Sequence, residues 1–195
     1  MTALKLTLFA LFWITFVYLI NCLIARKFKK IEIRQALLYT TSVGMLGVFG
    51  EVFVGHVYSF LFGEPLWLYH VLPIHNGFTS QYAPVIWGIL GFHLYLLHGT
   101  LTSRKAHSIN RLAFYFAGEA IIIELMGNYS FQAVFHQYIF YYFPPDLWHL
   151  TSVQTLPFYL AAGFVVTRTL KRLKAEPVFF TLMATGLAGV LVFMS

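Results

Sequence analysis

Six apolar segments follow one another along the chain, separated by short polar stretches. They cover approximately residues 3–25, 36–62, 82–101, 111–143, 156–169 and 178–194. Apolar runs of about 18 residues or more are typical of helices that cross a membrane, whereas a transmembrane barrel would need short strands with alternating side chains. The sequence therefore predicts an all-α fold, in which residues 1–195 form a single integral membrane domain of six transmembrane helices.

The fourth apolar segment is longer than a membrane requires. Residues 111–143 number 33, while about 20 helical residues cross the hydrocarbon layer. Gly127 and Asn128 lie within this segment, and both residue types are unfavourable inside a helix. We expect the helix to break at these residues and to continue as an amphipathic elbow; the alternative is one long helix that projects from the bilayer.

Twelve of the thirteen Lys and Arg residues fall into three clusters between the apolar segments. The clusters are Arg26, Lys27, Lys29, Lys30 and Arg34; Arg104, Lys105 and Arg111; and Arg168, Lys171, Arg172 and Lys174. Because basic residues accumulate on the cytoplasmic side of a membrane, the clusters predict that both termini lie on the non-cytoplasmic side. The first cluster follows the first apolar segment, which we therefore interpret as a retained span and not as a cleaved signal peptide.

The composition agrees with this topology. The chain is 59% hydrophobic and 10% charged, whereas soluble domains carry about 25% charged residues. The net charge of +6 comes from the three clusters, and without a basic stripe or a recognition motif it does not indicate nucleic-acid binding. We expect a multi-pass location in the plasma membrane, or in the inner membrane of a bacterium, with the lipid bilayer as partner. The single cysteine, Cys22, excludes an intrachain disulfide.

Three acidic residues lie within the predicted spans: Glu51, Glu119 and Glu124. Ionisable groups inside a bilayer are costly, face the interior of a helix bundle and often mark a functional site. We therefore expect these carboxyl groups to point inward and to be paired or protonated.

A polar stripe starts at one of these acids. Glu124, Asn128, Gln132 and His136 follow one another at four-residue steps, which places them on one face of a helix. The stripe favours two interpretations equally: a ladder of hydrogen bonds between helices, or a proton path or polar substrate pocket. A break at Gly127 would weaken the argument, because it would destroy the register.

The two predicted outer loops, residues 63–77 and 141–152, each combine an acid, a Trp and a His with Pro. The residues of interest are Trp67, His70, His75, Asp146, Trp148 and His149. His transfers protons near neutral pH, and acid–His pairs carry out general acid–base catalysis. We expect these loops to fold over the mouth of the bundle; the alternative is that the aromatic rings anchor at the membrane surface and the polar groups cap helix ends.

The remaining motifs indicate structural roles. His93 and His98 are five residues apart, whereas zinc-binding His pairs on a helix are four apart, so we interpret both as residues that hydrogen bond between helices. Ala184 and Ala188 mark a packing face on the last span, either inside the bundle or between two protomers of a homo-oligomer. No internal repeat is evident.

We interpret the chain as a membrane enzyme that acts on a lipophilic substrate, such as an isoprenoid, a sterol-like molecule or an acyl lipid. A carboxyl group shielded from water would donate a proton and a neighbouring His would accept one, in a cyclisation, isomerisation or hydration. The predicted catalytic residues are Glu124, Glu51, His136, His149 and Asp146. The predicted substrate-binding residues are Asn128, Gln132, His70, His75, Trp67 and Trp148. No cofactor and no metal are assigned.

Two other functions stay open. His and Glu side chains from several helices could hold a metal or a haem, for example through His56 with His93 or His136. A small transporter component is the second alternative, which repeated halves would favour.

Overall fold

The computed structural model describes residues 2–102 and 109–194, which are mostly helical. Arg104 and Lys105 of the second basic cluster lie outside the described residues. The α-helices are α1 (Ala3–Ala25), α2 (Ile33–Phe62), α3 (Ala83–Thr102), α4 (Ile109–Phe135), α5 (Leu156–Leu173) and α6 (Pro177–Phe193). The strands are β1 (Trp67–Tyr69), β2 (Pro73–Ile74), β3 (Thr79–Ser80) and β4 (Phe140–Tyr142), and the 3₁₀-helices are η1 (His75–Gly77), η2 (Asp146–His149) and η3 (Val153–Thr155).

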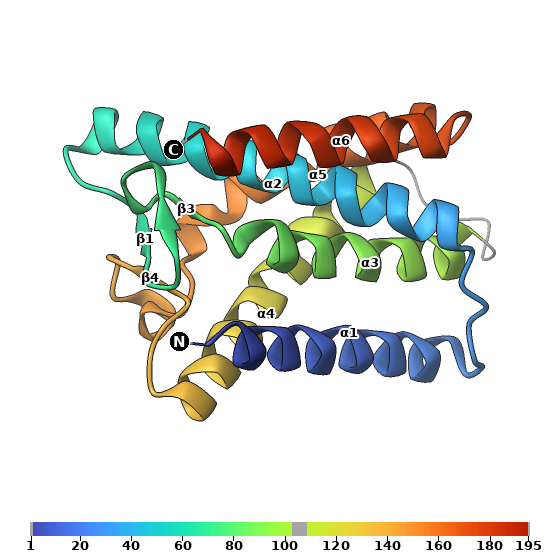
Figure 1. Ribbon diagram of the computed structural model, residues 1–195, viewed down its shortest axis with the longest axis horizontal. Helices are drawn as coiled ribbons and strands as arrows, with labels where there is room; N and C mark the ends of the chain where they lie inside the picture. The colour runs from blue at the N-terminus through green and yellow to red at the C-terminus, as the bar shows by residue number, and fades with distance from the viewer. Residues whose placement is uncertain (1, 103–108, 195) are drawn as a thin grey trace.

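The helices lie side by side, and successive helices reverse direction (Figure 1). The strands and both termini lie toward one end of the bundle, while the connection between α1 and α2 and the connection between α5 and α6, which carry basic residues, lie at the other. The predicted helical fold is confirmed. Within the described residues, α1 and α2 are long and apolar enough to cross a membrane, and shorter apolar helices occur at Ala83–His98 and Pro177–Phe193.

Helix α4 is continuous from Ile109 to Phe135, so the expected break at Gly127 and Asn128 is wrong. Asn is unfavourable in helices because its side chain competes for backbone hydrogen bonds, but the fully buried Asn128 amide is used elsewhere. It donates to the carbonyl oxygens of Phe140 (2.7 Å) and Leu150 (2.9 Å), and it accepts from the N–H of Ile139 (2.9 Å). The residue that disfavours a helix therefore fastens the following loop to it.

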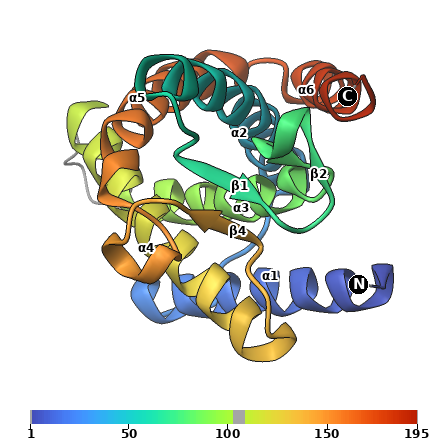
Figure 2. The same ribbon diagram turned by 90° about the vertical axis from the view of Figure 1, so that its left-hand side faces the viewer.

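Two short sheets occupy the strand end of the bundle, a feature that the all-α prediction missed. Strand β1 pairs antiparallel with β4, and β2 pairs with β3. The β1–β4 ribbon lies across the middle of the bundle end, with α2 and α5 on one side and α4 on the other (Figure 2). Its side chains are mostly aromatic, and such residues favour extended backbone and pair well across strands.

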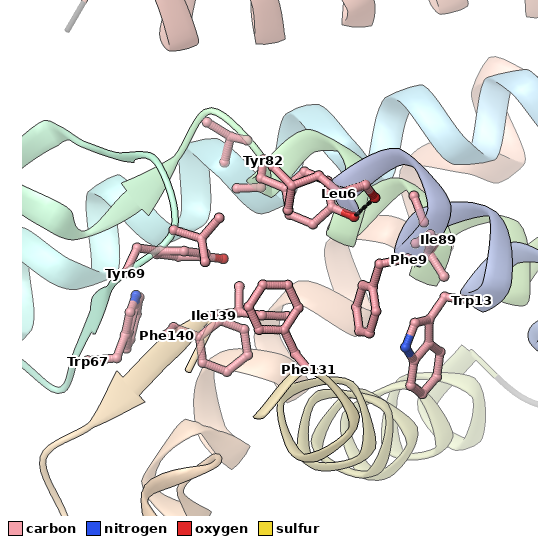
Figure 3. Packing of buried hydrophobic residues seen from close by; sticks show 14 of the residues in the cluster. Leu6, Phe9, Trp13, Trp67, Tyr69, Tyr82, Ile89, Phe131, Ile139 and Phe140 are labelled. Carbon is pink, nitrogen blue, oxygen red and sulfur yellow. Dashed lines mark hydrogen bonds between the residues drawn. The ribbon is translucent and has the colours of Figure 1, made fainter. Parts of the chain in front are cut away.

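Aromatic packing joins α1 to the bundle. The ring of Phe9 meets that of Phe131 on α4 edge-on, with 5.0 Å between centroids, and Trp13 donates its indole N–H to the hydroxyl of Ser130 at 3.2 Å. Tyr82 donates to the carbonyl oxygen of Leu6 at 2.9 Å. Figure 3 shows Phe9 and Trp13 directed toward α4.

At the other edge, α6 packs on α2, and Ala184 and Ala188 are among its buried residues. The predicted small-residue face of the last span thus lies within the described fold.

We expect Asn128→Ala to lower the free energy of unfolding by about 3 kcal/mol, because it leaves buried backbone groups without partners, at about 1–3 kcal/mol each. Chemical denaturation of the detergent-solubilised protein, followed by circular dichroism, measures the change. Tyr129→Ala at the adjacent exposed position is the control. Equal stability of the two variants would contradict the anchoring role of Asn128.

Candidate functional site

Glu51 on α2 is buried and accepts three hydrogen bonds. Tyr69 of β1 and the indole N–H of Trp87 on α3 (2.8 Å) donate to Oε1, and Thr79 of β3 (2.5 Å) donates to Oε2. A buried carboxyl group is stable only where such partners replace water. The strand layer and a neighbouring helix therefore hold this side chain in one position.

Glu124 on α4 has the same kind of surroundings. Tyr142 of β4 donates to Oε1 at 2.7 Å, and Thr151 donates to Oε2 at 2.5 Å. The phenol of Tyr159 on α5 also interacts with this carboxyl group. Each of the two acids thus lies beside a strand tyrosine, a threonine and an aromatic residue of a helix.

The phenols on the two strands are reliable donors. Burial raises the pKa of Tyr69 well above its ordinary value, and the adjacent Glu51 acts in the same direction. Burial and then Glu124 raise the pKa of Tyr142 in the same way. Both phenols therefore keep their protons throughout the physiological pH range.

The matching surroundings come from an internal repeat. The spacing between Glu51 and Glu124 is 73 residues, as is that between Tyr69 and Tyr142. The further equivalent pairs are spaced by 72 residues, one fewer: Thr79 and Thr151, Ser80 and Ser152, Trp87 and Tyr159, and Gly91 and Gly163. The order α2, β1, residues 79–80 and α3 is thus repeated as α4, β4, residues 151–152 and α5, a relation that the sequence prediction did not detect.

The geometry of the backbone repeats as well. Helix α2 ends at Gly63 with φ 78° and α4 ends at the equivalent His136 with φ 56°. In the β1–β4 ribbon, Leu68 pairs with Tyr141, the residue equivalent to it in the second repeat. Trp67 pairs with Tyr142 and Tyr69 pairs with Phe140, so each of these two residues pairs with the equivalent of the other. This register is that of a local two-fold axis through the ribbon. Because α2 and α4 both run toward the ribbon (Figure 1), the axis lies along the bundle.

Helix contacts follow the repeat too. A Cβ atom on Gly91 of α3 would lie 2.5 Å from the carbonyl oxygen of Tyr39 on α2. A Cβ atom on Gly163 of α5 would lie 2.9 Å from the carbonyl oxygen of Ala113 on α4. Each repeat therefore contains one close helix crossing that requires glycine.

Both acids face the centre of the bundle. A cavity of about 350 Å³ lies beneath the ribbon, and its lining includes Glu51 and Glu124. A smaller space of about 60 Å³ on the α1 side is also lined by both acids. The other lining residues of the large cavity are mainly apolar and aromatic, which is typical of sites for lipophilic ligands.

Trp87 and Tyr159 connect the two acids. Their rings meet edge-on, with 5.9 Å between centroids, and both line the two spaces. Trp87 donates a hydrogen bond to Glu51, and Tyr159 interacts with Glu124. The residues Glu51, Trp87, Tyr159 and Glu124 therefore follow one another across the site. Within residues 2–102 and 109–194, no cationic group is among the partners that act on either carboxyl group.

The predicted polar stripe is divided between two roles. Glu124 lines the large cavity, while Asn128 anchors the loop and lines the smaller space. Gln132 and His136 are not among the lining residues of either space, and His136 is exposed. The stripe therefore does not form a path from the cavity to the surface.

The predicted lid residues hold the loops together. His149 donates its Nδ1–H to the carbonyl oxygen of Tyr142 at 2.8 Å. The imidazoles of His149 and His70 both stack on the ring of Tyr141. Asp146 accepts from the N–H of Val153 at 2.9 Å.

Three more of the predicted residues are placed as follows. Trp67 lines the large cavity, His75 contacts the carbonyl oxygen of Leu191 on α6, and Trp148 is exposed. Of the loop residues predicted to bind substrate, the structure thus brings Trp67 to the cavity.

The prediction that His93 bonds between helices is confirmed. His93 contacts Asn21 of α1 at 2.8 Å and Glu119 of α4 at 3.1 Å. Glu119 thereby belongs to a separate network from the two cavity acids. Among residues 2–102 and 109–194, no group of three or more His, Cys, Asp or Glu side chains could hold a metal ion.

Comparison of the chain with protein-family models, with curated proteins and with solved structures found no match. The function is therefore inferred from the residues of the site. Sequence reasoning found both acids but missed their partners, for which the one available signal was the shared 18-residue spacing from each Glu to its strand Tyr.

We expect Gly91→Ala and Gly163→Ala to destabilise the protein by about 1–3 kcal/mol each, because the added methyl group pushes two backbones apart. Gly186→Ala, whose Cβ would meet nothing within 4 Å, should leave stability unchanged or slightly raised. Thermal unfolding in detergent compares the three variants. If all three unfold at the same temperature, the close crossings at Gly91 and Gly163 are not required.

Proposed function

We propose that the protein is an integral membrane protein of six spans, with its basic connections in the cytoplasm and both termini outside. The described helices carry many exposed large apolar side chains, among them Phe12, Phe53 and Phe179, each more than half exposed. Soluble proteins rarely expose extensive apolar surface, and a bilayer would cover it. The asymmetric distribution of positive charge supports the orientation.

Within that membrane setting, the proposed activity is acid–base catalysis on a lipophilic substrate of the isoprenoid, sterol-like or acyl-lipid class. The observation that carries this proposal is that Glu51 and Glu124 face one apolar cavity and each accept a hydrogen bond from an equivalent tyrosine and an equivalent threonine, with no cationic partner among the described residues. Glu119, in contrast, lies 3.1 Å from the imidazole of His93 and lines neither space. The second acid–base group in this proposal is a carboxylate and not a His.

The partners of the two acids suggest different tasks. The indole N–H of Trp87 can only donate, which favours the ionised form of Glu51. Glu124 lies beside the hydroxyl groups of Tyr142, Thr151 and Tyr159, each of which can also accept a hydrogen bond from a protonated carboxyl group. Glu124 is therefore the proposed acid and Glu51 the proposed base.

The reaction balances with these two groups. Glu124 adds its proton to one carbon of a double bond, whose electron pair forms the new C–H bond and leaves a carbocation on the other carbon. Glu51 then removes a proton from a neighbouring carbon, and that C–H pair becomes the new double bond. The faces of Trp87 and Tyr159 stabilise the cation between these steps. Before the next turnover Glu51 loses this proton and Glu124 regains one, so that the net reaction changes only the substrate. A second double bond that attacks the cation would give cyclisation, and water would give hydration.

The repeat also supports a second function, a carrier. Two halves with the same orientation, related by an axis along the bundle, occur in membrane transporters, and their binding sites lie between the halves. The two acids would then bind and release protons as a lipophilic solute crosses. A carrier releases its ligand unchanged on the other side of a liposome membrane, whereas the enzyme releases a chemically altered product.

We expect Glu124→Gln to reduce product formation by about 10²-fold or more, the usual contribution of a general acid, with little change in folding because the amide keeps the shape of the side chain. Mass spectrometry of lipid extracts from cells expressing the wild-type protein reveals the product as an isomer or a hydrate of a membrane lipid. Glu119→Gln, an acid of the same bundle outside the cavity lining, is the control. A Glu124→Gln variant that forms the product at the wild-type rate would exclude Glu124 as the acid.

Infrared spectroscopy of the purified protein in lipid nanodiscs tests the assignment of acid and base. A protonated carboxyl group has a C=O stretching band that a carboxylate lacks. We expect Glu124→Gln to remove such a band and Glu51→Gln to leave it in place. The opposite result would exchange the two roles, and loss of the band in neither variant would contradict the assignment.

A further inference from the structure

The large cavity reaches the side of the bundle between α2 and α5. Phe49 and Phe53 of α2 and Val165 of α5 line the cavity, yet they are 54%, 59% and 50% exposed. Side chains that both line a cavity and face outward lie at its mouth. The strand end is covered by the ribbon, since Trp67 and Tyr142 also line the cavity. The mouth therefore opens laterally, on an apolar face of the bundle.

Small residues keep this mouth wide. A Cβ atom added to Gly50 of α2 would meet nothing within 4 Å, and Gly50 lines the cavity next to Glu51. Ala161 and Ala162 line it from α5, and Ala161 is exposed. The open space beside Gly50 thus leads from the side of the bundle to the carboxyl group of Glu51.

The equivalent gap between α3 and α4 is closed. Ile123 of α4 occupies the position of Gly50, 73 residues further along the chain, and it lines the small space of about 60 Å³. Phe9 and Trp13 of α1 line the same space from outside, packed against α4 as Figure 3 shows. Helix α1 lies outside the repeat. The lining of the large cavity includes no residue of α1 or α6. Among the described residues, therefore, no helix covers the mouth between α2 and α5 as α1 covers the gap between α3 and α4.

We propose that the gap between α2 and α5 is a lateral passage through which the hydrocarbon chain of a lipophilic ligand enters the cavity from the membrane interior. This inference rests on the proposed membrane location and ligand class, but not on the proposed chemistry. The walls are apolar and aromatic, the mouth lies on an apolar face, and the carboxyl groups lie at the inner end. A single alkyl or isoprenoid chain fits this order, with its reactive carbons at the acids and the remainder in the passage.

Palmitic acid with a photoreactive diazirine near its chain end tests the passage on the full-length protein in liposomes. We expect saturable labelling of α2 within residues 43–54 and of α5 within residues 158–166, mapped by mass spectrometry of peptides. Gly50→Trp should reduce this labelling roughly tenfold, which corresponds to about 1.4 kcal/mol of binding free energy. Gly186→Trp, at a position equally free of contacts on α6, should not reduce it.

Ala161→Trp obstructs the passage from the α5 side and should reduce the labelling as Gly50→Trp does. Agreement between the two variants would show that the reduction does not come from misfolding of one of them. Labelling that spreads evenly over all exposed helix faces, or that neither obstruction reduces, would overturn the proposal. The inactive Glu124→Gln variant should still be labelled at the passage. If the proposed acid–base reaction is wrong, the labelling of α2 and α5 should still be observed. If the passage is wrong, the effect of Glu124→Gln on product formation should still be observed.

Discussion

A carboxyl group inside an apolar bundle must find hydrogen-bond donors to replace water, and this requirement determines the arrangement of the molecule. Glu51 and Glu124 each obtain one donor from a strand tyrosine. The strands that carry these tyrosines must therefore lie over the bundle centre, within reach of both acids, and they pair with each other there. Asn128 fixes the same ribbon from the α4 side through hydrogen bonds to the backbone of Ile139 and Phe140, at the start of β4.

The two repeats share this scaffold but differ at the aromatic helix residue beside each acid and at the residue that precedes each acid in the sequence. Trp87 in the first repeat corresponds to Tyr159 in the second, so that one acid has an obligate N–H donor and the other a hydroxyl group. Gly50 corresponds to Ile123, so that one gap between helices is open and the other filled. Under the proposed function, these two differences would give the equivalent acids different proton-transfer roles and would leave one of the two equivalent gaps open to the membrane.

The remaining polar groups hold the structure together. Asn21, His93 and Glu119 join α1, α3 and α4 through two hydrogen bonds, which keeps α1 against the side of the bundle where it closes the α3–α4 gap. His70 and His149 stack on Tyr141 at the strand end. Imidazole groups are therefore concentrated in packing roles, while the large cavity is lined by carboxyl, phenol and indole groups.

The sequence by itself determined the helices, their alternating direction and the two acids, because apolar run length, charge clusters and buried ionisable residues are local features. It misjudged Gly127 and Asn128, since helix propensity does not show that the Asn128 amide would be occupied by a loop. It also missed the ribbon, because the strands are only two or three residues long. It missed the repeat, because the equivalent residues differ in type at most positions. Only the tertiary structure decided which groups surround each carboxyl group, because these partners lie 18 to 36 residues away along the chain and meet only when the helices pack.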